Sequence, residues 1–161
     1  MRQNVRQVAV SSPIHLFSFG FGAGLSPVAP GTVGTLVGLA AYLALVPLGP
    51  AAYTAVVVLV FLAGCWTCGQ TAAALGVHDH PGIVADEIVG YLITMWYVPF
   101  EWYWVVAGFI LFRIFDIWKP WPVSWADRDI AGGFGIMLDD VLAALYAMLC
   151  LHGMVWAVQV I

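Results

Sequence analysis

The sequence predicts an all-α integral membrane protein, a polytopic bundle of about five hydrophobic helices that forms a single domain over residues 1–161. Three observations support this prediction. Hydrophobic residues make up 63% of the chain and charged residues 9%, whereas an ordinary soluble domain has about 25% charged residues. Apolar runs close to the roughly 20 residues of a membrane helix alternate with turns that contain proline and glycine. Finally, eight of the nine acidic residues lie where the ends of these runs would share one edge of the membrane.

The chain contains five candidate membrane helices: residues 32–48, 51–75, 83–100, 102–118 and 138–161. The first run ends in a turn rich in proline and glycine, and the fourth ends before Pro120, because proline cannot continue a helix. The third run carries two consecutive acidic residues in its first turn, and the fifth starts at another such pair. The first and third runs are short, so we expect them to cross with little tilt or to insert only in part.

The basic residues predict the orientation of the bundle. Five passes would place every Lys and Arg on one side, which the positive-inside rule assigns to the cytoplasm: Arg2, Arg6, Arg113, Lys119 and Arg128. The other side has short turns and an aromatic corner over residues 96–104, as expected of a belt at the membrane surface. Five basic residues without a basic stripe also argue against nucleic acid as a partner. We therefore expect the polar chemistry to lie in loops on the cytoplasmic face.

Two acidic pairs are the main candidates for catalytic and metal-binding residues. Asp86 and Glu87 open the third run, and Asp139 and Asp140 open the fifth. Helix capping is the alternative interpretation, but one residue would be enough for a cap, so two such pairs in one small bundle favour a functional role. Together with Asp116, these carboxylates would suit Mg²⁺, which proteins hold through a few carboxylates, water and substrate phosphate oxygens.

The end of the fourth run has the residues to bind a phosphate group. Arg113, Asp116 and Lys119 are spaced i, i+3, i+6 and share roughly one helix face. Arg113 would bind phosphate through two parallel hydrogen bonds, and Lys119, at the helix end, as a point charge. A structural ion pair between Arg113 and Asp116 explains the arginine equally well.

A glycine-rich loop over residues 20–35 opens the first run. Its glycines and the helix N-terminus would let backbone N–H groups approach an anion closely, which makes Gly31 and Thr32 candidate phosphate-binding residues. A tight membrane-entry turn is an equally good interpretation, because the Gly-Lys-Ser/Thr element of a P-loop is missing.

The remaining polar residues are weaker candidates. Asp79 and His80, in the loop before the third run, could help to bind a metal, but a polar loop that supports the next helix start is the simpler interpretation. Asp127 and Asp129 could belong to a solvated run of charges. A CxxC spacing inside the second run has no second pair, so buried small apolar residues explain it better than zinc or redox chemistry.

Four motifs, in the same order, resemble bacterial phosphatidylglycerophosphatase A over nearly the whole chain. They are GFGAGLSPVAPGT at residues 20–32, GVHDH leading to IVADE at 76–87, FRIFDIWKP at 112–120 and GGFGIMLDD at 132–140. The resemblance implies a Mg²⁺-dependent lipid phosphatase of the bacterial inner membrane. Such an enzyme hydrolyses phosphatidylglycerophosphate to phosphatidylglycerol and inorganic phosphate in phospholipid biosynthesis, with the phospholipid substrate and the bilayer as its partners.

Two mechanisms and two rival functions remain open from the sequence alone. Metal-assisted attack by water is the simplest mechanism, and an aspartyl-phosphate route is the alternative. A proton- or ion-coupled transporter could use the acids as relay groups, but acids gathered on one side rather than through the midplane disfavour it. A phosphatidyltransferase that uses a CDP-linked lipid is disfavoured because its Asp-Gly-x-x-Ala-Arg signature is absent.

Overall fold

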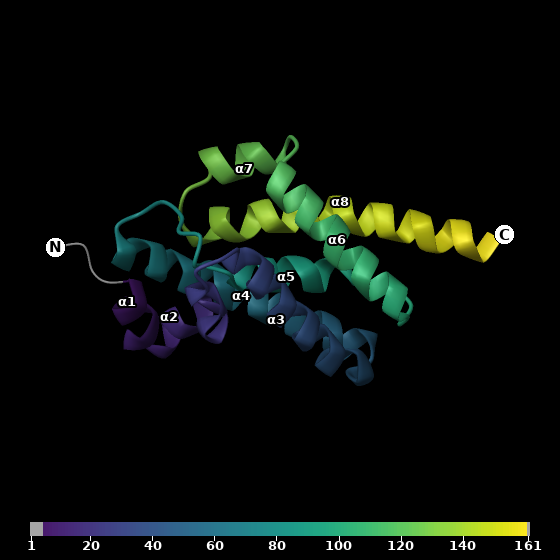
Figure 1. Cartoon of the computed structure of the whole chain (residues 1–161), viewed down its shortest axis with the longest axis horizontal. Coiled ribbons are helices and arrows are strands. Elements are labelled where there is room, and N and C mark those ends of the chain that lie inside the picture. Colours follow the sequence, from purple (N-terminus) through teal and green to yellow (C-terminus); the bar gives the residue numbers. More distant parts are fainter. Residues whose placement is uncertain (1–4, 161) are drawn as a thin grey trace.

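In the computed structural model, which describes residues 5–160, every regular element is a helix, as the sequence predicts (Figure 1). The elements are α1 (Val5–Ser11), α2 (Pro13–Ser18), η1 (Gly20–Leu25), α3 (Pro30–Leu45), η2 (Val46–Leu48), α4 (Pro50–Leu75), α5 (Ala85–Thr94), α6 (Trp102–Trp118), α7 (Val123–Asp129) and α8 (Gly132–Val160). Proline stands in the first turn of α2, α3 and α4, where its missing N–H leaves no hydrogen bond unmade. The helices predicted at 32–48, 51–75 and 102–118 are confirmed to within a few residues at their ends.

Three stretches are long and apolar enough to cross a membrane, namely Pro30–Leu48, α4 and α8. The 17 residues of α6 extend over about 26 Å, slightly less than a hydrocarbon core of about 30 Å. The ten residues of α5 extend over only about 15 Å. The predicted count of about five spanning helices is therefore not confirmed.

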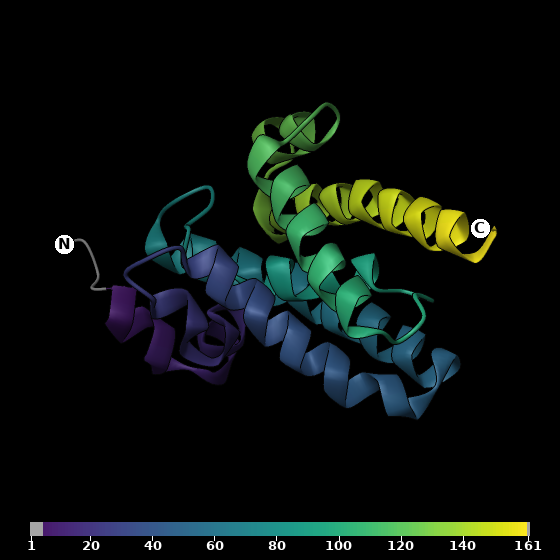
Figure 2. The ribbon, with the colours of Figure 1, turned by 45° about the vertical axis from the view of Figure 1, so that its right-hand side comes forward.

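The predicted helix over residues 83–100 is wrong in its length. Helix α5 stops at Thr94, Tyr97 takes a left-handed conformation with φ of 58°, and Pro99 prevents the helix from resuming. The helix lies in the middle of the bundle, where α3, α4, α6 and α8 contact it (Figure 2). Its buried Tyr91 donates a hydrogen bond from its hydroxyl to the carbonyl of Val105, at 3.0 Å. The bundle thus fixes the position of α5, and with it the acidic first turn.

Glycines on one face of α3 let this helix approach α5 closely. A Cβ atom on Gly34 would lie 2.6 Å from Cβ of Val84, and one on Gly38 would lie 3.0 Å from the carbonyl oxygen of Ile88. Small residues four positions apart are a common way for membrane helices to bring their backbones together. The third glycine of this face, Gly31, extends the same close approach to the acidic end of α5.

Helix α8 begins six residues earlier than the start predicted at residue 138, because its glycines serve helix packing rather than a loop. A Cβ atom on Gly133 would lie 1.9 Å from the carbonyl oxygen of Cys65 in α4. Only glycine allows the first turn of α8 to lie this close to α4. As a consequence, Asp139 and Asp140 lie inside the helix and not at its N-terminus, which excludes helix capping as the reason for this pair.

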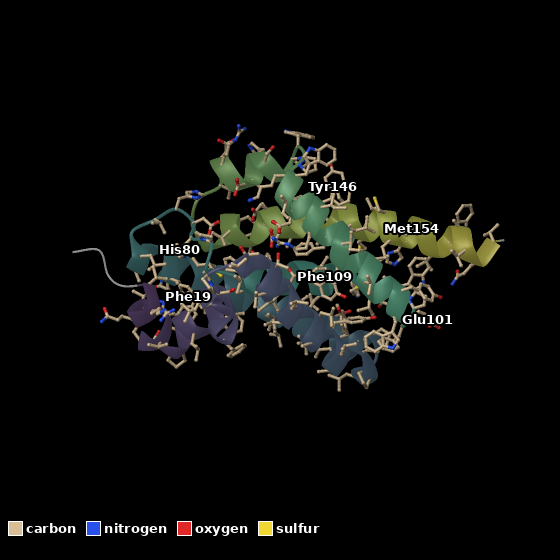
Figure 3. The ribbon with its side chains drawn as sticks, in the orientation of Figure 1. Phe19, His80, Glu101, Phe109, Tyr146 and Met154 are labelled. Carbon is tan, nitrogen blue, oxygen red and sulfur yellow. The ribbon has the colours of Figure 1, made fainter. Side chains whose placement is uncertain are left out.

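The short helices and long loops gather toward one end of the bundle. Phe19 and His80 lie at that end, whereas Glu101 and Met154 lie toward the other (Figure 3). Helices α1 and α7, which carry Arg6 and Arg128, lie away from the C-terminal end of α8 (Figure 1). This distribution is compatible with the predicted one-sided placement of basic residues, and Arg2 lies outside the described residues. The side of the membrane that each end would face stays a prediction.

Candidate active site

Carboxylates from three helices converge inside the bundle. Asp86 and Glu87 come from the first turn of α5, Asp116 from the last turn of α6, and Asp140 from the third turn of α8. One carboxylate oxygen from each of Asp86, Glu87 and Asp140 lies within 4.8 Å of the others. The carboxylate of Asp116 lies beside that of Asp140. The structure thus brings together four of the five acidic residues that the sequence predicts as catalytic or metal-binding.

Arg113 is the basic residue of this group. Its Nη1 donates a hydrogen bond to Oδ2 of Asp116 one turn along α6, and lies 3.9 Å from Oε1 of Glu87. Its Nε is buried and has no hydrogen-bond partner among the described residues. The predicted ion pair with Asp116 is therefore present, and Nε remains as a donor for a further acceptor. We call Asp86, Glu87, Arg113, Asp116 and Asp140 the Arg113 cluster.

The Arg113 cluster is strongly shielded from solvent. Asp86, Asp116 and Asp140 are buried, and the side chain of Glu87 is 13% exposed. Burial raises the pKa of Asp86 well above its usual range, and the charge of Glu87 raises it further. Burial also raises the pKa of Glu87. A bound divalent cation would oppose both shifts, because its charge favours the ionised carboxylates.

Gly31 is part of the wall of this cluster. A Cβ atom at residue 31 would lie 2.3 Å from Oε1 of Glu87 and 3.1 Å from Nη1 of Arg113. Any side chain here would displace the Glu87–Arg113 pair, so the glycine is needed for space beside the charged groups. Thr32, the other predicted phosphate-binding residue, follows in the first turn of α3 and is partly buried.

Lys119 forms a second charged group next to the first. Its Nζ donates hydrogen bonds to Oδ1 of Asp127 at 2.6 Å and to Oδ2 of Asp139 at 2.7 Å. Burial alone would lower the pKa of Lys119, but the charges of Asp139 and Asp127 outweigh it and keep the pKa above its usual range. We call Lys119, Asp127 and Asp139 the Lys119 cluster. Because its ammonium already has two carboxylate partners, the phosphate-binding role predicted for Lys119 stays a prediction.

The conformation of Lys119 explains how this pairing arises. The residue caps α6 in a left-handed conformation with φ of 47°, and the chain then turns through Pro120 into α7. Asp127 lies on α7, so this turn brings it back to Lys119. Asp139 reaches the same ammonium from α8. The Lys119–Asp127 pair had no signal in the sequence, because eight residues and a turn separate the two side chains.

The weak candidates Asp79 and His80 lie in the loop before α5, where the charge of Asp79 still acts on Asp86 and Asp139 and adds to the rise that burial causes in the pKa of Asp86. Oδ1 of Asp79 accepts a hydrogen bond from the backbone N–H of His80, and Nδ1 of His80 accepts one from Gly82. These contacts support the loop, in line with the simpler interpretation of the sequence. Asp129 is exposed at the end of α7. In residues 5–160, the one group of carboxylate, His and Cys ligands with metal-binding geometry is Asp86, Glu87 and Asp140.

The donor set of the Arg113 cluster fits a hard divalent cation. All three candidate ligands are carboxylates, which Mg²⁺ prefers, and they come from two helices that pack against each other. Oε2 of Glu87 and Oδ2 of Asp140 are buried and have no hydrogen-bond partner in the described part of the chain. Buried carboxylate oxygens need a donor or a cation. Glu87 and Asp140, with Asp86 beside them, are therefore the residues that would hold Mg²⁺.

Comparisons with known proteins agree with the resemblance found in the sequence. A family profile described as Phosphatidylglycerophosphatase A matches residues 16–155. The chain is 46% identical to Phosphatidylglycerophosphatase A of Escherichia coli (strain K12), over 86% of this chain and 81% of that protein. It is 45% identical to Phosphatidylglycerophosphatase A of Haemophilus influenzae, over 96% of this chain and 94% of that protein.

A third relative carries a different name. It is a Putative phosphatidylinositol-3-phosphatase of Bacteroides thetaiotaomicron, 40% identical over 89% of this chain and 94% of that protein. No solved structure matches the chain.

Proposed function

Since this chain belongs to the phosphatidylglycerophosphatase A family and is a lipid phosphatase, we propose that it hydrolyses phosphatidylglycerophosphate to phosphatidylglycerol and inorganic phosphate in phospholipid biosynthesis, with Mg²⁺ as its cofactor. The observation that supports this most is the carboxylate trio of Asp86, Glu87 and Asp140 directly beside Arg113. Ligands for a hard cation next to a guanidinium suit cleavage of a phosphate monoester, because both groups can neutralise charge on the phosphate oxygens.

We assign a separate role in this reaction to each kind of residue in the Arg113 cluster. Nε of Arg113, which has no other partner among the described residues, would bind a phosphate oxygen while Nη1 stays on Asp116 and Glu87. A carboxylate of the cluster would orient the attacking water and take its proton. The water oxygen bonds to phosphorus as the bond to the glycerol oxygen breaks. The proton taken from the water is returned to the glycerol oxygen, through the carboxylate or the solvent, and the glycerol part leaves as the alcohol. Mg²⁺, when bound, would neutralise charge on the phosphate oxygens.

Attack by a carboxylate is the alternative to attack by water. An aspartate of the cluster would then carry the phosphoryl group before water releases it. Acid quenching of the enzyme with a substrate labelled in its terminal phosphate separates the two routes. We expect no label on the protein, and a stable phosphoprotein would contradict direct attack by water.

We also propose that the protein lies in the bacterial inner membrane with the Arg113 cluster toward the cytoplasm. The three apolar stretches and the positions of Arg6, Arg113, Lys119 and Arg128 support this orientation. A reporter fused at Ser124 should read as cytoplasmic, and reporters at Glu101 and after the end of α8 should read as periplasmic. A cytoplasmic signal after α8 would contradict the proposed orientation.

The proposed activity is tested with protein purified in detergent. Phosphate release from phosphatidylglycerophosphate should require Mg²⁺, disappear in excess EDTA and return when Mg²⁺ is restored. Full activity in excess EDTA would contradict a required divalent cation. The Asp129→Asn variant serves as a control, because Asp129 is an exposed acidic residue outside both clusters.

Substrate preference is tested in the same assay. Phosphatidylinositol 3-phosphate is included because one relative carries the name of a putative phosphatase for that lipid. We expect a higher kcat/KM for phosphatidylglycerophosphate, because the two relatives named for that substrate are the more similar in sequence. A higher value for phosphatidylinositol 3-phosphate would contradict the proposed substrate.

A further inference from the structure

One face of α6 carries an apolar groove with the arginine of the active site in it. The groove has a volume of about 580 Å³, within the usual range of small-molecule sites. It is lined by Phe109, Ile110, Arg113, Ile114, Ile117 and Trp118. These residues follow the helical repeat, so they form one continuous strip about 14 Å long along the helix axis. Phe109 marks the middle of the helix in Figure 3.

Arg113 connects this groove to the carboxylates. The aliphatic part of the Arg113 side chain lines the groove, whose exposed surface is apolar, while its guanidinium donates to Asp116 and lies 3.9 Å from Glu87. Toward the start of α6, the wall of the groove is Phe109 and Ile110, and every groove residue other than Arg113 is apolar. A molecule that lay along the groove would place an apolar part beside Ile110, and its other end would reach the side of Arg113, whose guanidinium faces the carboxylates.

The end of the groove has the character of a membrane surface. Trp118 and Ile117 are both 71% exposed at the last turn of α6. Tryptophan favours the level of the lipid headgroups. Arg113 lies five residues before Trp118, or about 7.5 Å along the helix. The active site would thus lie just inside the headgroup level, within reach of a lipid phosphate from the side.

The other apolar grooves lack this connection. The groove between α4 and α8, which includes Val58 and Leu145, has no charged residue in its lining. The groove among α3, α4 and α5, which includes Val37 and Leu92, has none either. Any apolar groove on the outside of a membrane helix would face lipid. Of the three grooves compared, the α6 groove is the one whose lining includes a candidate phosphate-binding residue.

From this continuity we propose that the α6 groove holds an acyl chain of the lipid substrate, so that the phosphate monoester enters the Arg113 cluster sideways from the bilayer. The inference rests on the proposed function. It adds the path by which the lipid enters the site and the part of the lipid, an acyl chain, that α6 contacts. The apolar strip would position the chain, and the guanidinium would bind the anionic headgroup. Lipids without a phosphate would lack the charged contact at Arg113.

Two matched tryptophan substitutions test the groove. Ile110 is 52% exposed and lies in the α6 groove, whereas Val58 is 50% exposed and lies in the groove between α4 and α8. We compare kcat/KM for diacyl phosphatidylglycerophosphate with kcat/KM for the same headgroup phosphate without acyl chains. Ile110→Trp should lower kcat/KM for the diacyl substrate about tenfold relative to kcat/KM for the headgroup phosphate. Val58→Trp should leave this ratio as in the wild type. An unchanged ratio in Ile110→Trp, or an equal fall in both variants, would overturn the proposal.

A binding experiment on the wild-type protein separates this inference from the proposed function. The probe is a diacyl lipid with a phosphonate headgroup that cannot be hydrolysed and a photoreactive group in one acyl chain. Cross-linked peptides should come from α6 in excess over α4, and a neutral diacylglycerol probe should show no such excess. Equal labelling of α4 and α6 by the phosphonate would refute the groove even if the enzyme is active. Labelling of α6 without any phosphate release would refute the proposed function instead.

Discussion

Arg113 and Lys119 lie six residues apart along the chain, and each contacts carboxylates, but the balance of charge around them differs. The Arg113 cluster has four shielded carboxylates for one guanidinium, and two of their oxygens have no hydrogen-bond partner among the described residues. The Lys119 cluster has two carboxylates within 2.7 Å of one ammonium, and the side chain of Asp127 is 34% exposed. Oδ1 of Asp139 is also buried without a hydrogen-bond partner among the described residues, but the ammonium contacts both carboxylates and water reaches Asp127. The excess of negative charge is therefore smaller around Lys119 than around Arg113.

This difference indicates separate roles for the two clusters. Excess negative charge in a buried site is costly unless a cation or protons neutralise it, and for this reason we propose Mg²⁺ and phosphate binding at the Arg113 cluster rather than at the Lys119 cluster. The Lys119 cluster joins the end of α6 to α7 and α8 and so helps to fix the part of α8 that carries Asp140. Mutations in the first cluster should mainly reduce catalysis, and those in the second should mainly reduce stability.

The largest expected effect is that of Asp140→Asn. Loss of a carboxylate from the proposed cation site should lower kcat/KM about 10²–10³-fold, the size seen when one preorganised hydrogen-bond donor is removed from an active site. Mg²⁺ should raise the thermal stability of the wild-type protein in detergent by mass action, and this rise should be lost in the variant. Asp127→Asn should keep the response to Mg²⁺. A full response to Mg²⁺ in Asp140→Asn would mean that the cation does not bind at this cluster.

The sequence singles out every member of the Arg113 cluster, and Asp139 together with them, but it does not show how they meet. Acidic pairs in apolar runs are rare enough to mark Asp86, Glu87 and Asp140. Their convergence depends on α5 being a short buried helix, and the periodicity of a uniformly apolar run cannot show where such a helix ends. The sequence also predicts the start of α8 six residues too late, because glycines that allow close packing against α4 look like loop residues in a sequence.

The next effect in size is that of Arg113→Lys. Lysine keeps the charge, but its three N–H donors sit on a single nitrogen, so it lacks the planar fork that would let Nη1 stay on Asp116 while Nε binds a phosphate. Losing a charge-assisted hydrogen bond should cost about 1.5–3 kcal/mol, or roughly ten- to a hundredfold in kcat/KM. Thermal stability is measured on the same preparation. Lower stability with an unchanged kcat/KM would assign Arg113 a structural role, like the one inferred for Lys119.

Lys119→Met should reduce stability more than activity. Asp139 would lose the ammonium that lies 2.7 Å away, and about 1–3 kcal/mol of stability should be lost, less than for a fully buried pair because Lys119 is partly exposed. Adding Asp139→Asn should restore part of the melting temperature, because no uncompensated charge then remains at residue 139. A fall in kcat/KM as large as that of Arg113→Lys, without rescue by Asp139→Asn, would support the phosphate-binding role that the sequence predicts for Lys119.

The smallest expected effect is that of Asp127→Asn, and it tests whether the Lys119 cluster depends on α7. Lys119 would keep Asp139 as its partner, and the side chain of Asp127 is 34% exposed, so water can replace much of the lost contact. A partly exposed ion pair contributes about 0–1 kcal/mol, and the melting temperature should fall only slightly, with kcat/KM unchanged. Asp129→Asn, on the same helix but outside the cluster, should change neither quantity. If Asp127→Asn destabilised the protein as much as Lys119→Met, the contact with α7 rather than the pair with Asp139 would stabilise this end of the bundle.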